Sequence, residues 1–371
     1  MFENLPNPPR LFLLRHEEDE LRRRIQSDPQ LNAVYQLVLR ASDDILQLPL
    51  LERVVTGRRL LAVSRQLLRR TTHLGLAYRL TGDRKYALRA REEMLTVAKF
   101  SDWNPSHYLD VAEMTAGMAI GLDWCYDALD EQTRATLRQA IITLGLEPSL
   151  KHDHWSTWRN NWNQVCNAGM VLGALMVAEQ QPELAGRMIK RAIDTVPISM
   201  EEYAPDGAYP EGAMYWDYGT NFNVLLISAL QKALGDDFGL LSKPGLDRTA
   251  DYFVHVKGPT GLWFNYSDCH QARKFSLSPA MHFLAAWQNR PGLLFWERKS
   301  LEMLVQDPAI ARPRSTDRLL PLLLIWTRPE QSQGQPSANY FVGHGPTPVA
   351  LFRSAWDESA TFLGIKAGRA A

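Results

Sequence analysis

The feature that most limits the fold of this chain is a long succession of helix-length segments with apolar residues three and four positions apart. Several of these segments are joined by turns of only a few residues, and helices joined in this way run antiparallel. The pattern predicts a mainly α-helical chain in which antiparallel helix pairs form an incomplete (α/α) toroid. The expected helices cover residues 17–25, 31–46, 58–80, 85–99, 111–128, 131–144, 158–179, 182–196 and 218–234.

Helix stop and start signals lie between these segments. Gly82 is suited to end one helix and Asp83 to cap the next. Asp130 can cap the helix that follows it, and Pro182 fits a first helical turn. The longer, aromatic-rich connections at 100–109, 149–158, 203–217 and 258–275 are the expected place for function, because binding residues concentrate on such loops.

The character of the sequence changes near its end. Residues 328–338 have the Pro, Gln and Ser content of a linker, and residues 338–343, 349–354 and 360–366 have the composition of β-strands. We therefore expect a toroid domain over 1–327, and a linker with the opening strands of an antiparallel β-sandwich domain, cut short, over 328–371. Three strands cannot close a sandwich, so they either pack on the helical body or belong to a longer sheet.

Composition excludes several classes of function. Lys plus Arg equals Asp plus Glu, at 41 each, so the overall charge gives no reason to expect a nucleic-acid partner. The three cysteines are far apart and predict neither a disulfide framework nor a metal cluster. No apolar run approaches the ~20 residues of a membrane span, and the first residues do not have the pattern of a secretion signal. Phosphate-binding loops and GxSxG elbows are missing, so we expect no cofactor and no bound metal.

An unusual cluster of amides follows Arg159: Asn160, Asn161, Asn163 and Gln164 fall within an expected helix. Asparagine is a poor helix former, so the cluster needs an explanation. The amides either donate to the hydroxyls or carboxylates of a substrate, or they bond a neighbouring loop.

A second cluster contains Tyr215 and Tyr218, which share a face if their segment is helical. Either phenol could transfer a proton if positive charge were near, and otherwise both are core aromatics. The candidates for that charge are His154, Arg159, His270, Arg273 and Lys274.

Aromatic residues near both clusters suggest a carbohydrate cleft, in which rings stack on sugar faces. The tryptophans concerned are Trp155, Trp158, Trp162 and Trp216. His107 either contacts the substrate or ties its loop down, and Arg159 can bind a carboxylate bidentately. The pair His152 and His154 has no third ligand at a metal-binding spacing. A glycosidase with paired carboxylates is also allowed, from Glu113, Glu201, Glu202 or Glu211, although their spacing identifies no pair.

In three stretches of its sequence the chain resembles the heparinase II/III-like polysaccharide lyases. The resemblance rests on 104–114 (NPSHYLDVAEM), 160–170 (NNWNQVCNAGM), and 206–212 (DGAYPEG) running into 215–219 (YWDYG). It implies a helical toroid followed by a β-sandwich, and cleavage of uronic-acid glycans by β-elimination. By position, Asn161 resembles the residue that neutralises the uronate carboxylate and Tyr215 the catalytic tyrosine.

The resemblance implies further roles. Asn160, Asn163 and Tyr218 are the alternatives for catalysis if the register differs. Substrate binding is expected from His107, His154, Arg159, Asn160, Trp162, Asn163, Glu211, Trp216 and His270. The partner would be an acidic poly- or oligosaccharide of glycosaminoglycan or alginate type, and the compartment the periplasm. Family members continue beyond a segment like 362–366 into a strand with another catalytic or metal-associated histidine, whereas this sequence ends at Ala371.

Two other functions stay open on the sequence. One is a glycoside hydrolase on the same toroid, which would form no unsaturated product. The other is a non-catalytic protein that binds acidic glycans.

Overall fold

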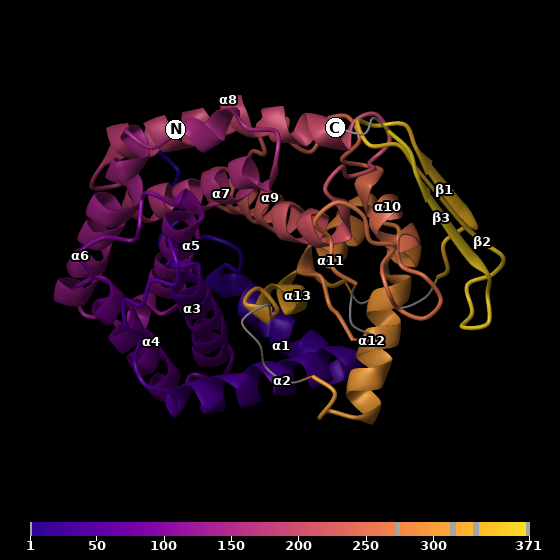
Figure 1. Cartoon of the computed structure of the whole chain (residues 1–371). Coiled ribbons are helices and arrows are strands. Elements are labelled where there is room, and N and C mark those ends of the chain that lie inside the picture. Colours follow the sequence, from indigo (N-terminus) through magenta and orange to yellow (C-terminus); the bar gives the residue numbers. More distant parts are fainter. Residues whose placement is uncertain (1, 272–274, 312–316, 329–333, 369–371) are drawn as a thin grey trace.

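The fold is that of a computed structural model, which describes residues 2–271, 275–311, 317–328 and 334–368. Its longer helices enclose a ring (Figure 1). The first are α1 (Glu18–Ser27), α2 (Pro29–Leu46), α3 (Leu61–Thr81), α4 (Arg84–Val97), α5 (Tyr108–Trp124), α6 (Glu131–Ala140) and α7 (Asn161–Val177). The others are α8 (Pro182–Met200), α9 (Gly212–Leu234), α10 (Thr249–His255), α11 (Pro279–Gln288), α12 (Phe295–Gln306) and α13 (Pro321–Trp326).

The ring has an inner and an outer layer, which confirms the predicted toroid of helix pairs. The inner helices α3, α5, α7, α9 and α11 contact one another in that order, and α4, α6, α8 and α12 lie outside them (Figure 1). Contacts of α12 and α13 with α2 join the end of the series to its beginning. Every residue of α5 is buried, so this helix forms the centre of the core.

Local signals set the helix boundaries largely as predicted. The Asp83 side chain accepts a hydrogen bond from the Lys85 N–H (3.0 Å), and Asp130 accepts one from Thr133 (2.7 Å). Gly82 ends α3 with a φ of 74°, a left-handed backbone conformation that residues with a side chain rarely adopt. The expected helix over 218–234 begins six residues earlier, at Gly212, so Tyr215 lies on the same helix as Tyr218.

Inner helices approach closely where one of them has a glycine. A Cβ at Gly169 of α7 would lie 2.4 Å from the carbonyl oxygen of Ala112 on α5. A Cβ at Gly219 of α9 would lie 2.0 Å from Gln164 Oε1 and 3.3 Å from Asn161 Cβ on α7. The absence of a side chain at Gly219 therefore places the start of α7 directly against α9.

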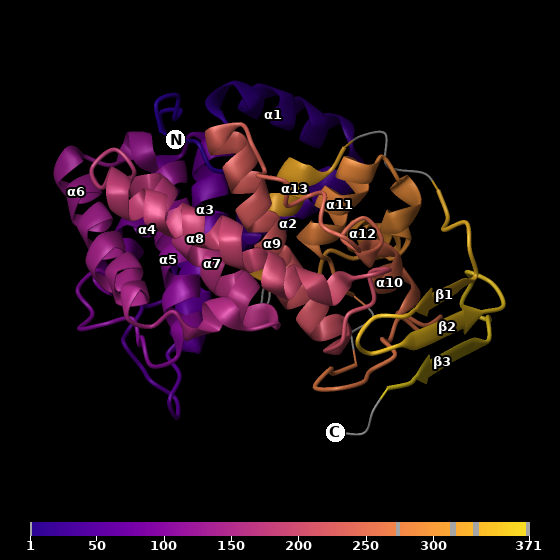
Figure 2. The same cartoon turned by 90° about the horizontal axis from the view of Figure 1, so that it is seen from above.

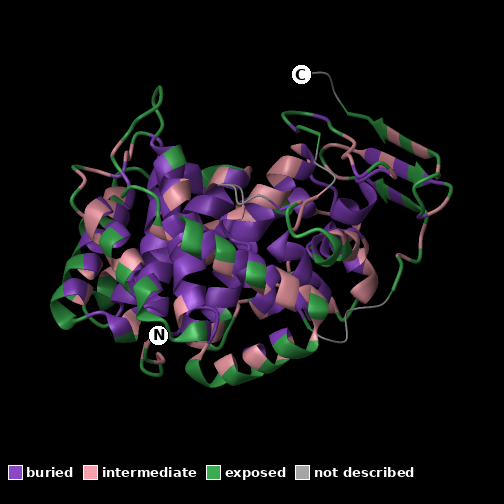
Figure 3. Cartoon of the chain, turned by 90° about the horizontal axis from the view of Figure 1, so that it is seen from below, coloured by how far each residue is buried: buried purple, intermediate pink, exposed green. Residues whose placement is uncertain are grey.

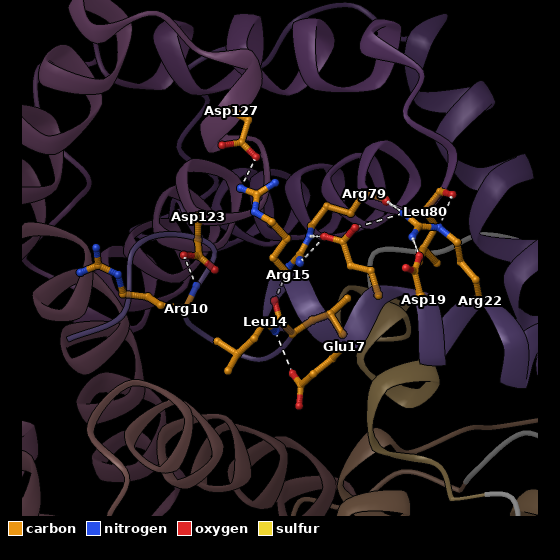
Figure 4. Close-up of polar contacts among 12 residues, drawn as sticks. Arg10, Leu14, Arg15, Glu17, Asp19, Arg22, Arg79, Leu80, Asp123 and Asp127 are labelled. Atoms are coloured by element: carbon orange, nitrogen blue, oxygen red, sulfur yellow. Dashed lines mark hydrogen bonds and ion pairs between the residues drawn. The ribbon is translucent and has the colours of Figure 1, made fainter. Parts of the chain in front are cut away.

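The N-terminal segment crosses one end of the ring and is held there by polar contacts (Figure 4). Asp123 at the end of α5 accepts hydrogen bonds from the backbone N–H groups of Arg10 (2.8 Å) and Leu11 (3.1 Å). Arg79 of α3 donates to the Leu13 carbonyl and to the carboxylate of Glu18. Because Arg79 and Asp123 are buried, these contacts fix the start of the chain to the inner helices.

Three antiparallel strands follow the helices, at the side of the ring near α10 (Figure 2). They are β1 (Tyr340–Gly343), β2 (Val349–Arg353) and β3 (Phe362–Lys366), in the order β1-β2-β3, close to the predicted strand segments. Phe341 pairs with Leu351, and both are buried against the helical body. The opposite face carries the exposed apolar residues Tyr340, Val342, Phe352, Leu363 and Ile365.

The sheet is anchored to the toroid through Arg353. Its guanidinium donates to the carbonyls of His255 (3.0 Å) and Lys257 (2.7 Å) and stacks 3.7 Å from the Trp356 ring centroid. Burial colouring shows the inner helices as a continuous buried region, with α1 and the outer face of the sheet more exposed (Figure 3).

Candidate functional site

A cavity of about 700 Å3 lies among the inner helices and the connections that follow α10 and α12. Its volume is in the range of small-molecule sites, ~300–1,000 Å3. The polar and aromatic residues that line it are Arg59, Arg65, His107, Asn161, Trp162, Tyr215, Asp217, Tyr218, Asn221, Phe222, Trp263, His270, Gln271, Phe275, Ser276, Asp317 and Arg318.

Asn161 reaches this cavity because of how α7 begins. The side chain of Asn160 caps the helix, accepting a hydrogen bond from the Trp162 N–H (3.1 Å), so Asn161 is the first helical residue. The amides are therefore at a helix start, where asparagine is favoured, rather than inside a helix as predicted. Asn161 is 3% exposed and faces α9 across Gly219. Its carboxamide thus lies beside the helix that carries both tyrosines.

Tyr215 lines the cavity from the first turn of α9 and is partly exposed. Burial raises the pKa of its hydroxyl, with Asp268 and Glu211 adding to the effect and Arg59 and Arg65 opposing it. The phenol therefore keeps its proton at neutral pH. In this environment Tyr215 is better suited to donate a proton than to remove one.

Tyr218, one turn further along, is held differently. Its hydroxyl donates a 2.6 Å hydrogen bond to Oε1 of Glu113, a fully buried carboxylate on α5. Arg65 and Arg318 lie over its ring, with guanidinium carbons 5.0 and 5.2 Å from the centroid. Burial and the neighbouring Glu113 raise the pKa of this phenol far above its usual value. The hydroxyl proton of Tyr218 is thus engaged in the hydrogen bond to Glu113.

Two arginines share the single carboxylate of Glu113. Arg65 Nε is 3.0 Å from Oε1, and Arg318 Nε is 2.6 Å from Oε2. Burial opposes the charge of Arg65, but Glu113 and Tyr218 outweigh it and raise its pKa, so it stays protonated. Two positive charges and one negative charge leave this group of three residues with a net positive charge. Arg65 and Arg318 thus offer local positive charge to a ligand, while Asp217 and Asp317 also line the cavity.

Asp217, which precedes Tyr218 on α9, also lines the cavity. Its Oδ1 accepts hydrogen bonds from Ser278 Oγ (2.5 Å) and Asn221 Nδ2 (2.8 Å). Burial raises the pKa of this carboxyl to about 6, although the Ser278 bond opposes the rise. Asp217 therefore changes charge near neutral pH.

His107, the residue directly before α5, lines the cavity. Its Nδ1 is 2.7 Å from Oδ1 of Asp110, and its ring packs edge-to-face on Trp162 at 4.7 Å. His107, Asn161, Trp162, Tyr215, Tyr218 and His270 are the predicted site residues that the structure brings to this one cavity. His270 is exposed at its edge. Arg273 and Lys274 lie outside the described residues.

Trp216 and Asn163 are not substrate-binding residues, so these two predictions were wrong. Trp216 is fully buried, stacks on Phe253 at 4.1 Å and donates its Nε1–H to Thr249 (2.7 Å). Asn163 is fully buried and donates to the carbonyls of Ser156 (2.6 Å) and Thr195. Neither side chain can reach a ligand, because both point from their helices into the core.

Other predicted residues lie outside the cavity wall. Asn160 is the cap described above, and Arg159 is an exposed ion-pair partner of Glu201 (2.8 Å). His154 is exposed and packs on Trp158, and Trp155 is buried in a stack with Tyr108. Glu211 is close to the backbone N–H of Asn161, and burial raises its pKa. Asn160, Arg159, His154 and Glu211 thus lie outside the cavity lining, and their expected contacts with substrate stay predictions. The burial of Trp155 contradicts its expected stacking on a sugar.

Sequence reasoning missed Arg65, Arg318 and Asp217. One signal was present: Asp110 and Glu113 are acidic residues three apart in an otherwise apolar segment, and buried carboxylates require partners. The sequence offered no way to choose those partners, since Arg65 and Arg318 are 253 positions apart and lie on opposite sides of Glu113 in the chain.

Comparison with known proteins shows a similar fold in a solved structure. No family model matches the sequence, and no curated protein matches it. Among solved structures, an alginate lyase from Bacteroides ovatus matches with a TM-score of 0.54 and 14% sequence identity, over 85% of this chain and 99% of that one. The two chains share a fold. No family match therefore supports the expected membership of the heparinase II/III-like lyases. The structural similarity to the alginate lyase supports a polysaccharide lyase fold.

No group of three or more His, Cys, Asp or Glu side chains in the described part of the chain is arranged to hold a metal ion. None of the described helices is long and apolar enough to cross a membrane.

Proposed function

We propose that the protein is a polysaccharide lyase that cleaves a uronic-acid-containing glycan by β-elimination. The observation that carries the proposal is the convergence of Asn161 and Tyr215 on one cavity whose wall holds the net positive group formed by Arg65, Arg318 and Glu113. A neutral amide donor, a protonated phenol and local positive charge are what an elimination beside a carboxylate requires. The alginate lyase fold supports the same class of reaction.

The chemistry explains why these groups suit the reaction. Removing the C5 proton of a uronate moves negative charge onto its carboxylate, which is already charged. A neutral donor at Asn161 stabilises that additional charge, and one preorganised donor of this kind contributes about 3 kcal/mol in comparable oxyanion sites. Tyr215 is the phenol that handles protons, and the Trp162 ring offers a face to a sugar.

The experiment is incubation of the protein with a panel of polyuronides, including alginate blocks and glycosaminoglycans, while the ultraviolet absorbance of the unsaturated uronate end is recorded. We expect one class to give this chromophore and Asn161→Ala to lower kcat/KM about 100-fold or more. Chain cleavage with saturated ends would instead identify a glycoside hydrolase. Saturable binding without cleavage would identify a glycan-binding protein.

A further inference from the structure

A line of aromatic rings leads from the cavity to the surface of the protein. Trp162 lines the cavity, and its ring packs on that of Trp158 with the centroids 5.2 Å apart. The Trp158 ring in turn packs on that of His154, at 5.1 Å. Trp162 is partly exposed, and Trp158 and His154 are exposed. These three residues, which we call the aromatic run, therefore continue the cavity wall onto the outer surface.

Trp158 is the most exposed tryptophan in the described part of the chain, at 36%. A large ring left in contact with water contributes less to folding than a buried one. Trp155, three residues earlier, anchors the segment instead: it is fully buried, stacks on Tyr108 at 5.5 Å and donates to the His152 carbonyl (2.7 Å). The same turn thus directs one tryptophan into the core and leaves the other ring accessible to a ligand.

The backbone that carries the aromatic run is fixed by contacts that do not use the exposed rings. The side chain of Asn163 donates to the carbonyl of Ser156 (2.6 Å), and Asn160 caps α7 by accepting from the Trp162 N–H (3.1 Å). A ring on a fixed backbone loses less conformational entropy when it binds a ligand than a ring on a mobile loop. The aromatic run is therefore a preorganised surface.

The geometry of the rings suits the apolar face of a sugar. His154 and Trp162 are each tilted by 60° to the Trp158 ring, so neither is stacked flat on one of its faces. The C–H groups on one side of a sugar ring can pack on such a face. The next residue, Arg159, is already paired with Glu201 (2.8 Å) and Glu202 (3.5 Å). We therefore assign recognition at this surface to ring contact rather than to that guanidinium.

We propose that the aromatic run binds the sugar units of a glycan chain that extends out of the cavity beyond Trp162, so that the protein prefers long oligosaccharides to short ones. This inference rests on the proposed function, because it places the reacting unit of that glycan beside Asn161. Asn161 and Trp162 are consecutive residues, so the run begins next to that unit. Binding energy from units remote from the reacting centre can raise kcat/KM.

The test measures kcat/KM on size-defined oligomers of increasing length, prepared from the polyuronide that the wild type cleaves. We expect Trp158→Ala to lower kcat/KM about tenfold on the long oligomers, and to leave the value for the shortest cleaved oligomer unchanged. Trp158→Phe, which keeps an aromatic face, should retain most of the gain with length. The matched control is Tyr340→Ala, which removes an exposed aromatic ring from the sheet and should equal the wild type at every length.

The outcomes separate this inference from the proposed function. A Trp158→Ala protein that equals the wild type on long oligomers, or that loses the same factor at every length, overturns the extended site and leaves the lyase function standing. A wild-type protein that forms no unsaturated ends from any polyuronide overturns the proposed function. Calorimetric titration of the wild type and Trp158→Ala with long oligomers then decides about the aromatic run: weaker binding by the variant supports it, and equal or absent binding overturns it.

Circular dichroism establishes that each variant is folded. If Trp158→Ala does not fold, His154→Ala removes the outer ring of the aromatic run instead. It should lower kcat/KM on the longest oligomers only, and an unchanged value on them would overturn the extended site.

Discussion

The Tyr218 hydroxyl donates to Glu113 at 2.6 Å, across the interface between α9 and α5. The same carboxylate binds Arg65 and Arg318, so one buried acid holds a phenol and two guanidiniums at the cavity wall. The two tyrosines of α9 are therefore inequivalent. The Tyr218 hydroxyl is already bonded to Glu113, whereas the Tyr215 hydroxyl makes no hydrogen bond within the described part of the chain and borders the cavity.

This difference predicts unequal effects of removing each hydroxyl. Tyr215→Phe should lower kcat/KM about 100-fold or more with little change in unfolding temperature, because the acid is lost and no structural bond is broken. Tyr218→Phe should lower stability by about 1 kcal/mol and leave more activity than Tyr215→Phe. Steady-state kinetics and thermal unfolding of the two variants measure both effects. The reverse order of activities would assign the proton transfer to Tyr218.

Glu113→Gln should destabilise the protein by about 3 kcal/mol, because two guanidiniums then lose their shared counter-charge. Denaturant unfolding measures this loss. The matched control is Glu131→Gln, which removes an exposed carboxylate that also binds two arginines, Arg134 and Arg138. Surface ion pairs contribute little, so the control should lose much less stability than Glu113→Gln. Equal losses in the two variants would contradict the role of Glu113.

The raised pKa of Asp217 predicts that the stability of the protein depends on pH. Its folded pKa of about 6 lies above the usual value of 3.8, so the folded state binds the proton more tightly. The resulting stabilisation is complete below the unfolded pKa and is lost as pH rises through about 6. Asp217→Asn should therefore gain stability relative to wild type between about pH 4 and pH 8, by about 3 kcal/mol. A difference that does not vary with pH would show that this carboxyl has an ordinary pKa.

Gly219→Ala should separate α7 from α9, because the added Cβ would lie 2.0 Å from Gln164 Oε1. Gln164 is fully buried and bonded to Tyr203, so it cannot turn aside easily. We expect a loss of stability of about 2 kcal/mol and a lower kcat, since Asn161 would move relative to Tyr215. In the control Gly186→Ala, on α8, nothing lies within 4 Å of the added Cβ, and a gain of up to ~1 kcal/mol is expected.

The two tryptophans Trp162 and Trp216 should respond to truncation in different assays. Trp162→Ala should raise KM about tenfold, equivalent to ~1.4 kcal/mol of substrate binding, while the fold persists. Trp216→Ala should instead cost about 3–5 kcal/mol of stability, because the ring is fully buried against Phe253. An unchanged KM in the Trp162 variant would remove that ring from the sugar-binding surface.

Much of the fold could be predicted because its signals are local. Apolar periodicity, caps such as Asp83 and the β-type composition after residue 338 each determine an element from its own residues. The unusual chemistry of the amide and tyrosine clusters pointed to the segments that border the cavity, and the family resemblance selected Asn161 and Tyr215 within them, whose catalytic roles stay predictions. Trp216 was misassigned because only the direction of its side chain, into the core of the ring, decides between a sugar platform and a packing residue.

The remaining parts of the site could not be predicted because they depend on which distant residues meet. The sequence shows that Glu113 is an acid in an apolar helix, but the identities of Arg65 and Arg318 as its partners follow only from closure of the ring. The pKa of Asp217 likewise depends on burial by segments that come later in the chain, such as the one containing Ser278.

Arg65 and Arg318 come from opposite ends of the chain and bind the same carboxylate of Glu113. The cavity therefore forms only when the ring of helices is closed, and no single helix pair can form it. A polypeptide ending before Arg318 would leave Glu113 with half of its compensating charge and the Tyr218 ring without one of its two guanidinium contacts. Such a fragment could contain α3 to α9 and still have no binding site. Ligand affinity in this architecture is thus a direct reporter of whether the last helices have docked onto the first.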